Sequence, residues 1–265
     1  KGAVKIMTKR NRQTVQENRQ NKKAETGRVI KEKFEEGRKV PPLTAKNESQ
    51  RKALSAFETK KLVILSGSAG TGKSELMCWW ASKLWCEGKI SNIVIVRPHQ
   101  QLGNDYGAVS GNDTLKLLPF CMSMLMKLKK YLGYGILKNN FRMEVAEGLF
   151  NEAAGIQILP IEKCQGMSFG PDTLILADEL QNATVAQVKA LTTRSEEGCA
   201  IIATGDNLQS ALRGKNGLQY LEEALQKHPH QDAEIIRFTP KDNCRSGIAG
   251  HLAALFETEG NWEDK

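Results

Sequence analysis

Hydrophobic positions follow two alternating patterns between residues 47 and 258 of this chain. Continuous apolar runs predict strands that are covered on both faces, and apolar residues three and four apart predict amphipathic helices. The predicted strands are 62–66, 92–97, 155–159, 173–177, 199–205 and 234–238. The predicted helices are 47–60, about 73–87, 114–132, 184–195, 216–227 and 246–258. This alternation predicts an α/β fold, with a mostly parallel sheet between two layers of helices.

Two segments fall outside the alternation. Residues 1–40 contain few hydrophobic positions and stop before Pro41-Pro42, so we expect a separate arm followed by a body over 41–265. Residues 133–155 show neither pattern, and we expect an insertion or a loop there. The predicted helix 114–132 contains Pro119, where we expect a kink, and a methionine-rich face that we assign to packing.

Positive charge is concentrated in the arm. The 265-residue chain has a formal net charge of +8, and residues 1–40 hold 13 lysines and arginines against five acidic residues. The body is balanced, with 25 basic and 25 acidic residues. A cationic segment attracts nucleic acid and other polyanions through counterion release; the alternative is a solvated tail without a partner.

Composition excludes several classes of protein. No apolar run approaches the roughly 18–20 residues that cross a bilayer, and no apolar stretch follows the basic start, so we expect no membrane segment and no signal peptide. The six cysteines include no CxxC pair and the four histidines show no zinc spacing, which predicts reduced thiols in a cytoplasmic protein. Because the first residue is Lys1, we expect a trimmed or fragmentary start.

One motif predicts a phosphate-binding loop. It matches G-x-x-x-x-G-K-[ST] between a predicted strand and a predicted helix, and comprises Gly67, Ser68, Ala69, Gly70, Thr71, Gly72, Lys73 and Ser74. The glycines allow backbone N–H groups to face phosphate oxygens, and the following helix adds the positive end of its dipole. Lys73 would reach the β- and γ-phosphates, and Ser74 would hold Mg²⁺. A glycine-rich turn without a ligand is the alternative.

A pair of acidic residues ends the strand 173–177. Asp178 would hold Mg²⁺, commonly through water, and Glu179 would act as the general base that polarises the attacking water. The alternative is a helix cap or a solvated turn. No N-K-x-D motif occurs, which argues against guanine specificity.

Single residues supplement these motifs. At the end of strand 199–205, Thr204 or Gln209 would sense the γ-phosphate or orient water, unless the segment is only a capped turn. Gln50 would pair with the adenine edge or else be an exposed helical glutamine. Arg97 would contact nucleic-acid phosphate or simply start a loop. Arg245 would act as an arginine finger, in cis or from a neighbouring subunit.

Taken in order, these motifs resemble the PhoH family of P-loop ATPases, which is similar to the RecA-like core of superfamily 1 helicases. The resemblance spans about residues 41–250 and is closest to phage-encoded members. It depends on residues 47–50, 67–74, 96–98, 165–169, 178–182, 204–209 and 217–218. The chain departs from the family at Leu180, where alanine is usual, and after Arg245, where Ser246-Gly247 replaces a His-Pro pair.

The resemblance implies ATP and Mg²⁺ as cofactors, RNA or single-stranded nucleic acid as a partner, and a homo-oligomer, often a hexameric ring. We therefore expect Mg-dependent ATP hydrolysis coupled to nucleic acid, in a helicase-like manner. The alternative is a nucleotide-gated module that tethers RNA or a protein with slow turnover and no strand separation. A nuclease is disfavoured because no separate acidic cluster with two-metal character occurs.

Overall fold

The computed structural model describes residues 39–99, 113–142, 155–245 and 247–258. From Val40 onward these residues lie in one compact unit, Val40–Lys265. The predicted arm, residues 1–40, lies almost entirely outside the described residues, as do residues 143–154 of the segment without a predicted pattern.

In the part of the chain that the structure describes, seven strands form a single sheet. They are β1 (Leu62–Gly67), β2 (Asn92–Arg97), β3 (Phe141–Arg142), β4 (Ile156–Pro160), β5 (Thr173–Ala177), β6 (Ala200–Gly205) and β7 (Ala233–Phe238). Their order across the sheet is β3-β4-β2-β5-β6-β1-β7, and every pairing of neighbours is parallel. The prediction of a parallel sheet is therefore confirmed. Because β6 separates β1 from β5, the carboxyl ends of these three strands lie side by side.

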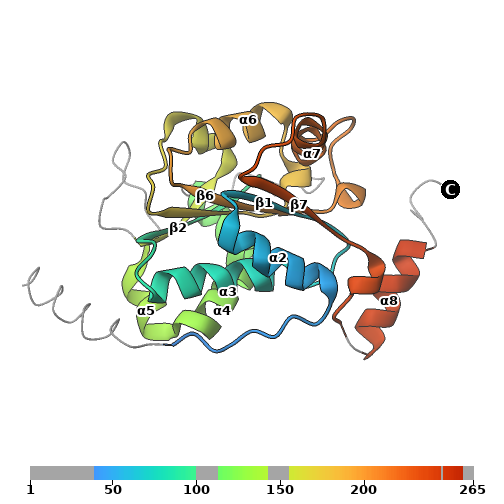
Figure 1. Cartoon of the computed structure of the whole chain (residues 1–265), viewed down its shortest axis with the longest axis horizontal. Coiled ribbons are helices and arrows are strands. Elements are labelled where there is room, and N and C mark those ends of the chain that lie inside the picture. Colours follow the sequence, from blue (N-terminus) through green and yellow to red (C-terminus); the bar gives the residue numbers. More distant parts are fainter. Residues whose placement is uncertain (1–38, 100–112, 143–154, 246, 259–265) are drawn as a thin grey trace, which may run out of the picture. The chain divides into compact units, whose positions relative to one another are not determined.

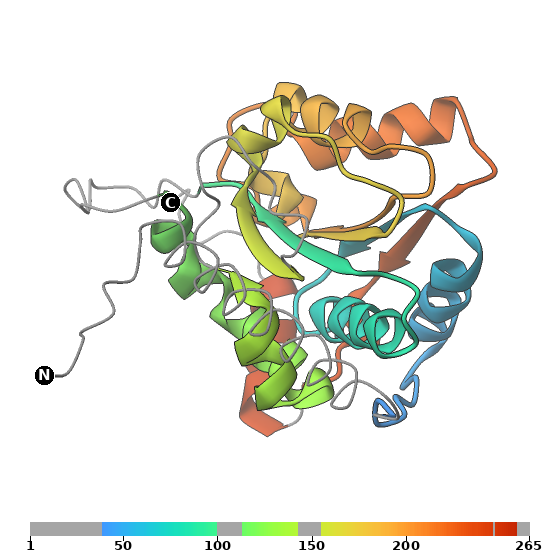
Figure 2. The same ribbon diagram turned by 90° about the vertical axis from the view of Figure 1, so that its left-hand side faces the viewer.

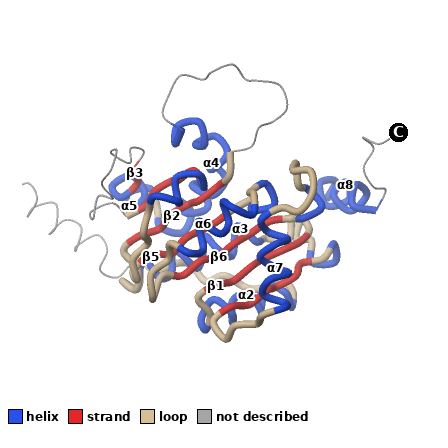
Figure 3. The backbone as a smooth tube through the Cα atoms, turned by 90° about the horizontal axis from the view of Figure 1, so that it is seen from above, coloured by secondary structure: helices blue, strands red, loops and turns tan. Residues whose placement is uncertain are grey.

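Helices cover both faces of the sheet (Figures 1 and 2). One layer contains α2 (Glu48–Thr59), α3 (Lys73–Cys86), α4 (Asp113–Leu132) and α5 (Tyr134–Asn140), and the other contains α6 (Val185–Thr193) and α7 (Gly217–Lys227). The last helix is α8 (Gly247–Thr258). In the view from above, the strands of the sheet lie side by side, with helices overlapping them (Figure 3).

The strands are apolar without alternation because each face packs against its own core. Along β1, Val63 and Leu65 belong to the core beneath α2, α3 and α4, whereas Ile64 belongs to the core beneath α6 and α7. Side chains of successive strand residues point to opposite faces, so both positions must be hydrophobic. This double burial explains why the apolar runs predict the strands well.

The predicted elements from residue 47 onward are confirmed within one or two residues at most ends. Asn47 caps α2, and its side chain accepts a hydrogen bond from the Gln50 N–H. The segment 133–155 differs from the expectation, because α5 and the edge strand β3 occupy its first part. A helix of seven residues is too short to show a period, and the two residues of β3 are ordered by pairing with β4.

Pro119 lies within α4, which continues on both sides of it. Among the described residues, no helix is both long enough and apolar enough to cross a membrane. All six cysteines are free thiols, and four of them are buried.

Candidate nucleotide-binding site

The predicted phosphate loop is the turn between β1 and α3. Gly67, Gly70 and Gly72 have φ angles of 111°, 76° and 89°, which side chains rarely adopt. A Cβ atom at Gly67 would lie 2.0 Å from the Phe238 carbonyl oxygen. The helix α3 begins at Lys73 directly after the last glycine, so the partial positive charge of its N-terminus lies at the loop.

The side chain of Lys73 is folded onto this loop. Its ammonium group donates hydrogen bonds to the carbonyl oxygens of Gly67 and Ser68, the latter at 2.7 Å. The Thr71 hydroxyl donates to the Ser68 carbonyl oxygen at 2.9 Å and lies 3.5 Å from the ammonium nitrogen. The cation is thus held by weak neutral acceptors, which an anionic phosphate would outcompete.

Gln50 lies behind the loop and is only 5% exposed. Its amide nitrogen donates to the Thr71 carbonyl oxygen at 2.9 Å, and its amide oxygen accepts from the Lys46 N–H at 2.8 Å. The alternative of an exposed helical glutamine is therefore wrong. The pairing with an adenine edge stays a prediction; in this structure both amide atoms are bonded within the protein and the residue does not line the pocket.

Asp178 follows β5 and is 6% exposed. Its Oδ1 accepts a hydrogen bond from the Thr204 hydroxyl at 2.6 Å, and its Oδ2 lies 3.1 Å from Nη1 of Arg97. Both carboxylate oxygens are therefore bonded, one from each neighbouring strand, since Arg97 ends β2 and Thr204 lies in β6. The structure puts Arg97 beside this carboxylate, so it does more than start a loop, and its predicted contact with nucleic-acid phosphate stays a prediction.

Glu179 is the only described residue other than glycine with a positive φ, at 59°. It precedes the short 3-10 helix η2 (Leu180–Asn182). One oxygen accepts from the Gln181 amide at 2.5 Å, and the other lies 3.9 Å from Nη2 of Arg97. The left-handed backbone turns this side chain away from the direction of the strand, and 35% of it is exposed.

The segment after β6 is organised by Asp206. Its carboxylate accepts from the Leu208 N–H at 3.1 Å and from the Gln209 amide at 2.9 Å, which caps the 3-10 helix η3 (Asn207–Gln209). The backbone N–H of Asp206 donates to Gln181, and so joins this turn to the segment after β5. The capped turn that the sequence offered as an alternative is present, and Gln209 is nevertheless at the pocket.

Arg245 reaches the loop from the segment after β7. The Cys244 N–H donates to the Gly70 carbonyl oxygen at 2.9 Å. The Arg245 side chain lies over Gly70 so closely that a Cβ atom there would be 2.9 Å from its Cδ and Nε. The arginine therefore approaches the loop of its own chain.

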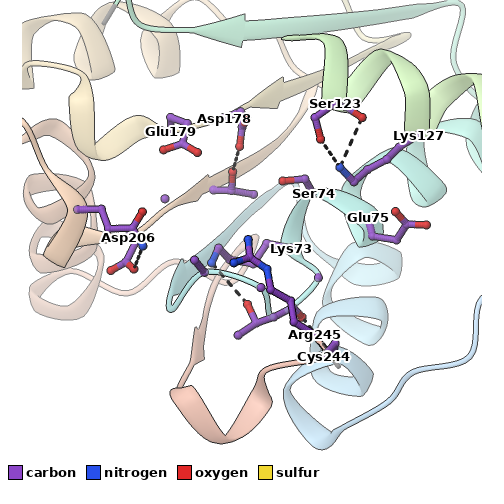
Figure 4. Close-up of a pocket in the computed structure, with 17 residues that line it drawn as sticks. Lys73, Ser74, Glu75, Ser123, Lys127, Asp178, Glu179, Asp206, Cys244 and Arg245 are labelled. Atoms are coloured by element: carbon purple, nitrogen blue, oxygen red, sulfur yellow. Dashed lines mark hydrogen bonds between the residues drawn. The ribbon is translucent and has the colours of Figure 1, made fainter. Parts of the chain in front are cut away.

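These residues surround one pocket of about 400 Å³ (Figure 4). Lys73, Ser74, Asp178 and Glu179, which are far apart in the sequence, all line it. The other predicted residues that line it are Ala69, Gly70, Thr71, Gly72, Thr204, Gln209 and Arg245. Gly67 and Ser68, at the start of the loop, do not line it, nor does Gln50, which supports the loop from behind.

The sequence model of the PhoH-like protein family matches residues 42–257, which include every element of this pocket. The chain belongs to the PhoH-like protein family. This is a family of P-loop NTPases, so the resemblance in the motifs is confirmed.

Relatives of this PhoH-like chain have modest identity to it. It is 28% identical over 214 residues to Protein PhoH of Escherichia coli (strain K12), covering 80% of the chain and 58% of the relative. It is 31% identical over 214 residues to Protein PhoH2 of Bacillus subtilis (strain 168), covering 77% of the chain and 46% of the relative. The chain thus spans about half the length of the curated relatives it matches.

Among solved structures, the PhoH-like chain is similar to the large terminase from a thermophilic bacteriophage. The identity is 15%, and the match covers 80% of this chain and 49% of the terminase with a TM-score of 0.47. A similarity at this level gives no information about substrate.

Six pocket residues were not among those to which the sequence assigned a role. They are Glu75, Ser123, Lys127, Gly205, Asp206 and Cys244. Lys127 and Ser123 lie one turn apart on α4, and Lys127 donates to the Ser123 hydroxyl at 2.6 Å. The sequence signal for these two residues is a pair of polar positions at i and i+4 in a methionine-rich helix. Nothing in the sequence indicates that this helix, α4, reaches the phosphate loop.

Glu75 anchors α4 to α3 at the edge of the pocket. It accepts hydrogen bonds from Lys130 and from the Tyr131 hydroxyl, both at 2.5 Å. Burial would raise the pKa of Glu75, but these hydrogen bonds outweigh it and hold the pKa below the ordinary carboxyl value. Burial and the bond to Glu75 raise the pKa of Tyr131 to about 12.

Proposed function

We propose that this chain hydrolyses ATP with Mg²⁺ in the pocket and couples the hydrolysis to RNA or single-stranded nucleic acid. The observation that carries the proposal is that Lys73, Ser74, Asp178 and Glu179 line one pocket. A cation, a hydroxyl and two carboxylates around a glycine-rich loop are the groups that phosphoryl transfer to water requires.

The phosphate-binding role belongs to the loop, Lys73 and the N-terminus of α3. Lys73 would exchange its two carbonyl acceptors for phosphate oxygens, a charge-assisted bond that is stronger than the bonds it replaces. Gln50 would hold the loop from behind through its bond to Thr71, and Gly67 would allow the start of the loop to lie against the backbone of β7.

Ser74 and Asp178 would hold Mg²⁺. A hydroxyl and a carboxylate are the hard oxygen donors that suit this ion, and both residues line the pocket. The bound ion would neutralise charge on the phosphates during transfer. Thr204 would orient Asp178 through its 2.6 Å hydrogen bond.

Glu179 would polarise the attacking water. It is the carboxylate with the greater exposure of the pair and its backbone turns it away from the strand. Gln209 would help to orient the same water. Arg245, which lies over Gly70, would act as the arginine finger in cis.

The proposals of nucleic-acid coupling and of ring assembly rest on the family resemblance and on the charge of the arm. The arm has 13 basic residues against five acidic residues, which favours a polyanionic partner. One RecA-like domain cannot form a two-domain cleft, so movement along a strand would need neighbouring subunits, for which we propose a hexameric ring.

Steady-state ATP hydrolysis, measured with and without single-stranded RNA, tests this function. Several-fold stimulation is expected for the wild-type chain. Lys73→Ala should abolish turnover, and Lys83→Ala, on the same helix but outside the pocket, should not. Turnover that survives Lys73→Ala would overturn the assignment of the pocket.

The alternative function is a nucleotide-gated binding module that tethers RNA or a protein. It predicts ATP binding with slow turnover and no response to RNA. The change in the rate of ATP hydrolysis on adding RNA therefore distinguishes the favoured function from the alternative.

A further inference from the structure

One exposed surface on α4 and α5 is unlike the rest of the body. We call it the α4–α5 surface; it comprises Met122, Met126, Lys129, Tyr134 and Lys138. Met122 and Met126 are 45% and 55% exposed. They lie one turn apart on the side of α4 opposite its buried residues, and Lys129 continues the same stripe.

The charge of this region is of one sign. Residues 114–142 contain five lysines and one arginine and no acidic residue, whereas the body as a whole is balanced. Lys130 is paired with Glu75. Lys129 and Lys138 are exposed and have no acidic partner among the described residues. Their charge is therefore available to an external anion.

Tyr134 lies between these two lysines and is 62% exposed. The ammonium nitrogens of Lys129 and Lys138 lie 5.4 and 5.9 Å from the centre of its ring. An exposed aromatic ring flanked by cations is the arrangement on which single-stranded nucleic acid binds, with a base on the ring and phosphates on the cations.

A second tyrosine on the other face of the sheet makes the contrast clear. Tyr220 of α7 also lies between two lysines, Lys189 at 5.0 Å and Lys215 at 6.0 Å. It is only partly exposed, and Lys215 is paired with Glu223. One lysine of this cluster is therefore paired with an acidic residue, whereas neither Lys129 nor Lys138 of the α4–α5 surface has such a partner among the described residues.

We propose that the α4–α5 surface binds single-stranded nucleic acid, with Tyr134 stacked on a base and Lys129 and Lys138 on the flanking phosphates. The inference rests on the proposed function for the class of partner and adds the place where the strand binds. A duplex does not fit, because its bases are stacked on each other and offer no free face to Tyr134.

The same helix connects this surface to the pocket. Ser123 and Lys127 of α4 line the pocket, and the Phe120 carbonyl oxygen accepts from Arg97 at 2.9 Å. Arg97 also contacts Asp178. A strand on the α4–α5 surface would therefore act on the ATPase pocket through α4.

The test measures binding of a fluorescently labelled oligouridylate to the full chain over a range of salt concentrations. Tyr134→Ala should weaken binding at least about fivefold, and Tyr134→Phe, which keeps the aromatic face, should change it less than about twofold. Lys129→Gln/Lys138→Gln should reduce the salt slope by about 1.4, the value for two phosphate contacts. Each variant should keep its basal ATPase rate, and Tyr134→Ala and the double lysine variant should lose RNA stimulation.

Lys189→Gln/Lys215→Gln is the matched control, with the same change of charge around Tyr220. If this control weakened RNA binding as much as the α4–α5 variants do, or if all variants bound RNA like the wild type, the role of the α4–α5 surface would be overturned. The proposed function would still stand. Absence of any RNA binding by the wild-type chain would overturn the nucleic-acid part of the function itself. If the variants lost binding of an acidic protein probe but kept binding of RNA, the surface would be assigned to a protein partner.

Discussion

At the scale of single residues, Arg97, Asp178 and Glu179 form one charged unit. The guanidinium group of Arg97 lies 3.1 Å from an oxygen of Asp178 and 3.9 Å from an oxygen of Glu179. Thr204 and Gln181 bond the remaining oxygens. Two adjacent carboxylates that repel each other are thus held in fixed and different positions, one buried and one directed toward solvent.

Glu179→Gln is expected to keep ATP affinity and to lower kcat at least about 10²-fold, the usual effect of losing a general base. The amide has the same shape but cannot take a proton from water. Nucleotide binding by titration and steady-state turnover measure the two effects separately. Glu58→Gln, an exposed residue of α2 outside the pocket, should leave both unchanged, and full turnover of Glu179→Gln would reject the role.

Arg97→Ala is expected to lower the free energy of unfolding by about 3 kcal/mol, because the buried Asp178 carboxylate loses its cation. Urea denaturation measures this loss. The exposed pair Arg51–Glu48 is the control, since Arg51→Ala should cost less than about 1 kcal/mol. Adding Asp178→Asn to Arg97→Ala should restore part of the stability, and simple addition of the two losses would contradict the pairing.

At the scale of elements, α4 has two different sides. Leu117, Cys121, Met124 and Leu128 are at most 1% exposed and pack in the core, whereas Met122 and Met126 are exposed. The helix is fixed against α3 by the hydrogen bonds from Tyr131 and Lys130 to Glu75. Its position at the pocket therefore depends on a polar contact as well as on packing.

Tyr131→Phe is expected to lower the free energy of unfolding by about 1.5–3 kcal/mol, the range for a hydrogen bond to a charged group. Because the pKa of Glu75 is held below its ordinary value, this stabilisation is present above the unfolded-state pKa and is lost as the pH falls through the folded-state pKa. Urea unfolding at neutral and acidic pH should show the difference shrinking in acid. Tyr134→Phe, whose exposed hydroxyl has no partner among the described residues, should show no difference at either pH.

At the scale of the whole molecule, the body has no excess charge, and the arm contributes the positive charge of the chain. The longest stretch of the body without an acidic residue includes 114–142, and it is basic. We propose that the arm would attract a polyanion without sequence selectivity, and that the α4–α5 surface would bind bases by stacking.

Removing residues 1–40 is expected to remove most of the salt-dependent affinity for nucleic acid, because the arm holds 13 of the 38 basic residues and few acids. Fluorescence anisotropy at several salt concentrations measures the slope. ATP hydrolysis without nucleic acid should persist, since the pocket lies in the body. An unchanged slope after truncation would show that the arm does not contact the strand.

The sequence by itself determined the strands, most helices and the phosphate loop. These depend on local causes: double burial makes strand residues continuously apolar, and a loop that packs against a strand requires glycine at Gly67. Asp178 and Glu179 could be found for the same reason, because they directly follow an apolar strand. The family resemblance followed from these local motifs.

Only the tertiary structure decided which distant residues meet. The insertion of β6 between β1 and β5 brings Thr204 onto Asp178, and the place of β2 beside β5 brings Arg97 to the same carboxylate. The packing of α4 on α3 brings Lys127 to the pocket and leaves Tyr134 exposed. Such contacts depend on strand order and helix packing between residues that are 26 apart for Thr204 and Asp178 and 81 apart for Arg97 and Asp178, and periodicity along a chain contains no information about them.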